Sequence, residues 1–186
     1  MSKQQRLIEQ ALLVMMVNTP FDEITMSDLI THTGLGRATF YRYFKSKVDI
    51  LDAINERIRL DIEAKLRETV QKIGPGQSFI VYVAETLDAY YEHRDELKIL
   101  WGENTTGNSV IRLVEQAKPF LGSYVNVKSA DTRHIPTDYA INLSLGTYVT
   151  MMIFWLTKPL PEKPEIFKTI LLNAFNTPPM NLIEKV

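Results

Sequence analysis

The feature that most constrains the fold is a helix-start signal that occurs three times in the first fifty residues. Ser2–Gln5, Thr25–Asp28 and Ser46–Asp49 each place a hydroxyl residue three positions before an acid or an amide. This is the capping-box pattern that opens helices. Apolar residues follow each box at helical spacing, and Pro20 and Gly34 end the first two segments. The first quarter of the chain is therefore predicted to form short helices joined by tight turns.

The rest of the sequence repeats the helical period and shows no long alternation of period two, which predicts an all-α fold. We expect a three-helix head over residues 1–46 that contains a helix-turn-helix. A long connecting helix over 46–73, ended by glycine and proline, then opens a larger helical body over 47–186. Further helices are expected at 78–93, 95–101, 109–121, 136–157 and 165–175, about nine in total.

Composition narrows the chemistry that the chain can perform. The 186 residues carry a net charge of −1 and no cysteine, which excludes disulfides, thiolate zinc sites and a cysteine nucleophile and fits a reducing cytoplasm. His32, His93 and His134 lie far apart, so we expect no metal site and no cofactor. No nucleophile elbow, P-loop or dinucleotide fingerprint occurs, and the chain is not expected to be an enzyme.

One apolar stretch is nearly long enough to cross a membrane. Residues 140–156 carry no charge, but they contain Asn142, Ser144, Gly146, Thr147 and Thr150 and lack a basic flank at the start. A membrane span usually needs about 20 predominantly apolar residues. We therefore expect a buried helix of a soluble protein and no membrane partner.

The segment from Gly34 to Lys47, GLGRATFYRYFKSK, gathers four basic residues and four aromatic residues and contains no acid. It follows a short helix through a glycine turn, the arrangement of a helix-turn-helix whose second helix enters the DNA major groove. Helical spacing turns Leu35, Phe40 and Phe44 toward the other helices. The outer face is left with Arg37, Thr39, Tyr41, Arg42 and Tyr43.

These outer side chains suit contact with DNA, which presents negatively charged phosphates and the hydrogen-bonding edges of its bases. Arg37 can offer two donors to a guanine, and Ala38 keeps the helix slim near the groove floor. Thr39, Tyr41 and Tyr43 can donate hydroxyl hydrogens to phosphates, and Lys47 begins a helix where anions are attracted. The plainer interpretation is a solvated charged face, with one of the tyrosines partly in the core.

The run ITMSDLITHTGLGRATFYRYFKSKVDIL, from Ile24 to Leu51, resembles the DNA-binding head of the TetR family of bacterial transcriptional regulators. The shared features are a hydrophobic-Thr start, the glycine turn, the Thr-x-Tyr-x-aromatic-Phe helix, and a lysine followed by an acid. Gly36 departs from the pattern, because the family often carries a hydroxyl there. The resemblance implies DNA contacts at Thr25, Ser27, Gly36, Arg37, Ala38, Thr39, Tyr41, Arg42, Tyr43 and Lys47.

The resemblance also implies a body that binds a small-molecule effector and forms a homodimer. An aromatic and methionine-rich set would line the effector pocket, although ordinary core packing explains the same residues: Tyr90, Tyr91, Trp101, Tyr148, Met151 and Trp155. The last two long helices would form the dimer interface, with contacts at Ser144, Gly146, Thr147, Phe167 and Leu171.

The function expected from the sequence is a bacterial, cytoplasmic, sequence-specific transcriptional regulator. The family's commoner mode is repression, with release from a pseudo-palindromic operator when the effector binds. Two alternatives stay open. One is an adaptor that uses the helix-turn-helix to bind protein, and the other is a helical enzyme, for which Glu103 and His93 are weak hints.

Overall fold

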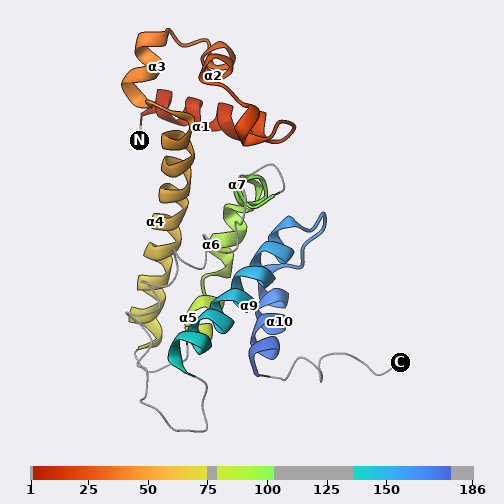
Figure 1. Cartoon of the computed structure of the whole chain (residues 1–186). Helices are drawn as coiled ribbons and strands as arrows, with labels where there is room; N and C mark the ends of the chain where they lie inside the picture. Colours follow the sequence, from red (N-terminus) through yellow and green to blue (C-terminus); the bar gives the residue numbers. More distant parts are fainter. Residues whose placement is uncertain (1, 75–78, 103–135, 177–186) are drawn as a thin grey trace, which may run out of the picture.

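A computed structural model describes residues 2–74, 79–102 and 136–176, and within these ranges it contains helices and no strand (Figure 1). The all-α prediction is confirmed, and the helix expected at 109–121 lies outside the described residues. The elements are α1 (Lys3–Met16), the 3₁₀ turn η1 (Phe21–Glu23), α2 (Met26–Thr33), α3 (Arg37–Tyr43), α4 (Lys47–Ile73), α5 (Phe79–Ala84), α6 (Leu87–Glu92), α7 (Arg94–Leu100), α9 (Thr137–Thr157) and α10 (Pro164–Asn176).

The three predicted helix starts are present as complete capping boxes at the beginnings of α1, α2 and α4. At α4, for example, the Asp49 backbone N–H donates to Ser46 Oγ at 3.1 Å, and the Asp49 carboxylate accepts from the Ser46 N–H at 3.0 Å. Gly34 and Gly74 end α2 and α4 with φ values of +66° and +84°, which favour glycine. Local sequence signals therefore fix these boundaries.

The helix expected over 78–93 is divided into α5 and α6, which differs from the prediction. Thr86 lies at the break, and both its backbone N–H (2.9 Å) and its hydroxyl (2.7 Å) donate to the Val83 carbonyl. A threonine hydroxyl that bonds to a nearby carbonyl competes with the regular helical ladder. The side chain of Thr86 thus offers the backbone a tighter turn that hydropathy spacing does not reveal.

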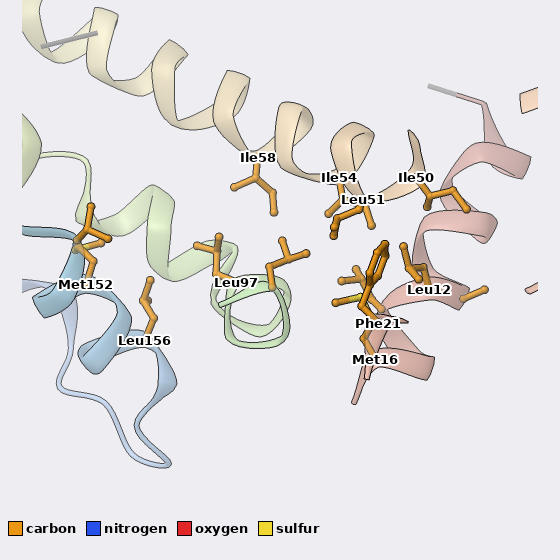
Figure 2. Packing of buried hydrophobic residues seen from close by; sticks show 14 of the residues in the cluster. Leu12, Met16, Phe21, Ile50, Leu51, Ile54, Ile58, Leu97, Met152 and Leu156 are labelled. Atoms are coloured by element: carbon orange, nitrogen blue, oxygen red, sulfur yellow. The ribbon is translucent and has the colours of Figure 1, made fainter. Parts of the chain in front are cut away.

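A single hydrophobic core runs from the head into the body. Figure 2 shows Ile50, Ile54 and Ile58 of α4 pointing toward the side chains of the head and of α7. In Figure 1, α4 leaves the head and runs beside the body, where α9 and α10 lie together. Because the first turns of α4 are buried in this cluster, the core of the head extends past residue 46.

Arg57 joins α4 to both α1 and α7. Its Nε donates to Glu9 Oε2 at 3.1 Å, and its two terminal nitrogens donate to the Glu96 carboxylate at 3.0 and 2.8 Å. The Glu9 side chain is only 3% exposed, whereas those of Arg57 and Glu96 are 17% and 21% exposed. One guanidinium therefore balances two carboxylates where the head, the connecting helix and the body meet.

Among the described helices, none combines the length and the apolar character needed to cross a bilayer. Helix α9, which carries no charge over residues 140–156, instead buries one face, which includes Leu145, Met152 and Leu156, and exposes the other.

Candidate nucleic-acid interface

The helix-turn-helix consists of α2, the turn at Gly34–Gly36, and α3. Thr25 caps α2: its hydroxyl oxygen accepts from the Asp28 N–H at 3.2 Å, and its own N–H donates to Asp28 Oδ2 at 3.0 Å. The Thr25 hydroxyl also donates to Asp28 Oδ2 at 2.6 Å, and this bond, followed by the one from the Thr25 N–H, lowers the pKa of the Asp28 carboxyl. Gly34 then donates to the Ile30 carbonyl and reverses the chain toward α3.

The core-facing side of α3 is set by its aromatic residues. Phe40 and Phe44 are buried, together with Leu29 and Ile30 of α2, as the spacing predicts. Leu35 is partly buried against the same cluster. This anchoring fixes the rotation of α3 about its own axis, and therefore the set of side chains that faces outward.

The outward side of α3 carries the basic and hydroxyl residues. Arg37, Ala38, Tyr41 and Arg42 are exposed, and Thr39 is half-buried. Thr25, Ser27 and Gly36 are exposed at the start of α2 and at the turn. Gly36 caps α3 with an extended backbone and no side-chain hydrogen bond, so the departure at this position leaves α3 without a hydroxyl cap.

The end of α3 is tied to the start of α1. The Tyr43 hydroxyl bonds with the Ser2 side chain and accepts from Arg42 Nη2 at 3.5 Å, and both contacts lower the pKa of the phenol. The Arg42 guanidinium also lies 5.2 Å from the centre of the Tyr43 ring. Tyr43 is half-buried, so it combines the core and surface roles that the sequence left open.

The geometry of Lys47 differs from the prediction. Its ammonium donates to the backbone carbonyls of Phe21 (2.7 Å), Asp22 (2.8 Å) and Ile24 (2.8 Å), and it lies 4.8 Å from the Phe21 ring centre. An ammonium has three N–H donors, and all three are used here. In the protein without DNA the ammonium is therefore held by internal contacts, and the contact with a phosphate stays a prediction. Sequence reasoning missed the internal contacts because the partners lie 23 to 26 positions away.

The residues expected to line an effector pocket are packed against one another. Trp155 is 0% exposed, stacks on Phe167 at 4.2 Å between ring centres, and donates from Nε1 to the Glu162 carbonyl. It is a core residue, which favours the plainer interpretation at this position. Burial raises the pKa of the Tyr90 and Tyr148 hydroxyls, which face each other inside the body. Tyr91 and Trp101 lie at the edges of this aromatic group, and Met151 is half-buried.

The residues expected at a dimer interface separate into two groups. Ser144 and Thr147 are exposed on α9, and a Cβ added at Gly146 would meet open space. Phe167 and Leu171 are instead 3% and 0% exposed, so in this structure their side chains pack inside the protomer's own core. The exposed apolar residues of α10 are one position earlier, Ile166 and Ile170. A helical face shifts by about 100° per residue, which hydropathy alone did not resolve here.

Comparisons with known proteins agree with this geometry. Residues 10–54 match the sequence model of the bacterial regulatory proteins of the tetR family, a segment that includes α2, α3 and the buried start of α4. No curated protein resembles the chain closely enough to count as a match.

Similar folds occur among solved structures. A TetR transcriptional regulator from Streptococcus agalactiae 2603V aligns with a TM-score of 0.59 and 19% identity over 92% of each chain. Two weaker likenesses are the TetR family repressor AlkX from Dietzia sp. strain DQ12-45-1b (TM-score 0.45, 18% identity, 91% and 95% of the two chains) and Thermus thermophilus FadR, solved with lauroyl-CoA (TM-score 0.47, 15%, 98% and 97%).

The helix-turn-helix geometry, the match over residues 10–54 and the fold shared with a solved TetR regulator agree with one another. The head of the chain is a helix-turn-helix of the kind found in the bacterial regulatory proteins of the tetR family, and the chain shares its fold with a TetR transcriptional regulator.

Proposed function

We propose that the protein represses transcription as a homodimer that binds a pseudo-palindromic operator and leaves it when a small-molecule effector binds the body. Each protomer inserts α3 into a major groove, and the two-fold symmetry of the dimer repeats the half-site. The head and the body are the two functional units, and the cytoplasm, where bacterial DNA is accessible, is the place of action.

The observation that carries this proposal is the fixed rotation of α3. Phe40 is fully buried, while Arg37, Ala38 and Tyr41 are exposed on the other side of the same helix. Because the core holds this face in place, the exposed side chains reach a duplex in one orientation. Preorganised donors on a rigid helix are what base-specific readout needs.

We assign base readout to the start of α3 and phosphate contacts to the hydroxyl residues around it. Arg37 lies in the first turn of α3, with Ala38 beside it and Arg42 on the same exposed surface. Thr25, Ser27, Thr39, Tyr41 and Tyr43, with the backbone N–H groups near Gly36, supply neutral donors to phosphate oxygens.

We assign dimerisation to the exposed faces of α9 and α10. Tyr139, Leu143 and Phe154 lie on one face of α9 with exposures of 67%, 65% and 67%, and Ile166 and Ile170 continue the apolar surface on α10. Apolar surface of this extent marks an interaction site on a protein of this size. The small residues Ser144, Gly146 and Thr147 allow the α9 helices of two protomers to approach closely.

The effector site is assigned to the aromatic group of the body, without Trp155. Tyr90 and Tyr148 place two phenol groups in an apolar setting, which suits an apolar ligand with a hydrogen-bonding group. Binding there would act on the heads through α4, because Arg57 links α4 to both α1 and α7. The effector changes DNA affinity only by as much as it prefers one arrangement over the other.

The two alternatives have less support. The helical enzyme relied on Glu103, which lies outside the described residues, and on His93. The His93 ring contacts the carboxylates of Asp61 (3.2 Å) and Glu96 (3.4 Å), so it belongs to the polar cluster around Arg57. If the helix-turn-helix bound a protein, as the adaptor alternative requires, the exposed arginines would not select a base sequence.

Selection of bound duplexes from a random pool tests the proposal. We expect an enriched pair of inverted half-sites whose centres are about one helical turn, or a multiple of it, apart. Arg37→Ala should relax the preference at one position of each half-site, a change of about 1–3 kcal/mol in discrimination, while Tyr41→Phe weakens binding to all sequences alike. A pool without enrichment by the wild-type protein would overturn the proposed function.

A further inference from the structure

Lys47 occupies the first position of α4, and its side chain crosses to the segment that connects α1 to α2. Its three acceptors belong to the 3₁₀ turn η1 and to Ile24, the residue that precedes the cap of α2. The N–O distances of 2.7 to 2.8 Å are typical of strong hydrogen bonds from a charged donor. The ammonium thus joins two segments that are separated by the whole helix-turn-helix.

The contact with Ile24 acts directly on the start of α2. The Ile24 carbonyl and the Thr25 N–H belong to the same planar peptide group, so fixing one fixes the other. That N–H donates to Asp28 Oδ2 in the capping box of α2. Lys47 therefore sets the orientation of the peptide that begins the helix-turn-helix.

From this geometry we propose that Lys47 is a positioning residue, which holds the start of α2 in its DNA-binding orientation and does not bind a DNA phosphate itself. The inference deepens the proposed function and rests on it. It also gives α4 a rigid connection to α2, because the lysine backbone belongs to α4. A movement of α4 is then transmitted to the start of α2 as well as to α1.

Arginine distinguishes this role from a phosphate contact. Each nitrogen of a guanidinium carries at most two N–H groups in a plane, so no single nitrogen can donate to three surrounding carbonyls as the lysine ammonium does. Arginine binds phosphate at least as well as lysine. Lys47→Arg thus keeps a phosphate contact and removes the clamp, while Lys47→Met removes both.

The experiment compares Lys47→Arg and Lys47→Met with the wild type and with Lys45→Met. Lys45 is an exposed lysine two positions earlier, so Lys45→Met removes the same charge without touching the clamp. Binding to a random-sequence duplex that spans two half-sites is measured over a range of salt concentrations, below the lowest unfolding temperature of the set. Amide hydrogen exchange at Thr25 is followed in the absence of DNA.

We expect both Lys47 variants to bind about tenfold more weakly, the low end for losing hydrogen bonds to a charged group, with the salt slope of the wild type. The Thr25 amide should exchange faster in both variants and not in Lys45→Met. Adding Thr25→Val to a Lys47 variant should weaken binding less than it does in the wild type, because the position of Thr25 is already lost.

Two results would overturn the inference. If Lys47→Arg binds like the wild type and Lys47→Met loses about 0.9 of the salt slope per protomer, Lys47 contacts a phosphate. If both variants only unfold at a lower temperature and bind normally when folded, the residue has a structural role alone. A wild-type protein that shows no salt-dependent DNA binding would instead reject the proposed function, and the exchange of the Thr25 amide would still test the clamp.

Discussion

Replacing Arg57 with methionine should lower the free energy of unfolding by about 2–3 kcal/mol. The substitution keeps the bulk of the side chain but leaves the carboxylates of Glu9 and Glu96 without their shared cation. Removing one partner of a buried pair costs about 3–5 kcal/mol, because the other charge stays buried without compensation. Glu9 is 3% exposed and meets this condition, whereas Glu96 is partly hydrated, so we expect less than the full range.

Chemical denaturation at a fixed protein concentration measures this effect, since dimerisation makes apparent stability depend on concentration. For a chain of this length, the loss corresponds to a fall of roughly 4–12 °C in the unfolding temperature. Arg59→Met is the matched control. Arg59 lies two positions further along α4, is 50% exposed and bridges Glu56 and Glu63. Glu63 keeps Arg67 as a second partner when Arg59 is removed, and pairs of an exposed cation contribute about 0–1 kcal/mol.

A double variant tests whether the buried carboxylate of Glu9 causes the loss of stability. If the loss comes from an uncompensated buried carboxylate, adding Glu9→Gln to Arg57→Met should restore about 1–2 kcal/mol, because a neutral amide costs less to bury than a charge. A double variant no more stable than Arg57→Met would refute this explanation. So would an Arg57→Met protein as stable as Arg59→Met.

Three further predictions follow from the caps and the exposed faces. Phe154→Glu should convert the dimer to a monomer in analytical ultracentrifugation, while Leu60→Glu, on the exposed side of α4, should not; a dimeric Phe154→Glu protein would exclude this face. Gly36→Ser should stabilise the protein by a few tenths of a kcal/mol in denaturation curves, since its backbone is extended and a Cβ meets open space, and a loss would show that the cap cannot form. The pKa values of Asp28 and Asp49 are lowered, chiefly by the hydroxyl three positions earlier, so their caps stabilise the fold above the ordinary carboxyl pKa of 3.8 and weaken as pH falls through the lower folded values. Amide hydrogen exchange at the starts of α2 and α4 should then accelerate as the pH falls below 3.8, after correction for the intrinsic exchange rate. Corrected exchange rates that do not change with pH would contradict this prediction.

Much of the head could be predicted from sequence because its signals are local. A capping box needs a residue and its neighbour three positions later, and a left-handed helix end needs a glycine, so α2 begins and ends where the sequence indicates. The burial of Phe40 and Phe44 follows from helical spacing within a short segment. These interactions span a few residues, so a local sequence pattern is enough to predict them.

Tertiary structure decided the features that depend on distant partners. Lys47 became an internal clamp because carbonyls 23 to 26 positions earlier surround its ammonium. Arg57 became the junction of three helices because Glu9 and Glu96, 48 and 39 positions away, converge on it. Phe167 of α10 stacks on Trp155 of α9, and this packing determines which face of α10 is buried. The sequence by itself determined where helices begin and which family the head belongs to, and only the packing of those helices decided which charges bind a partner and which hold the protein together.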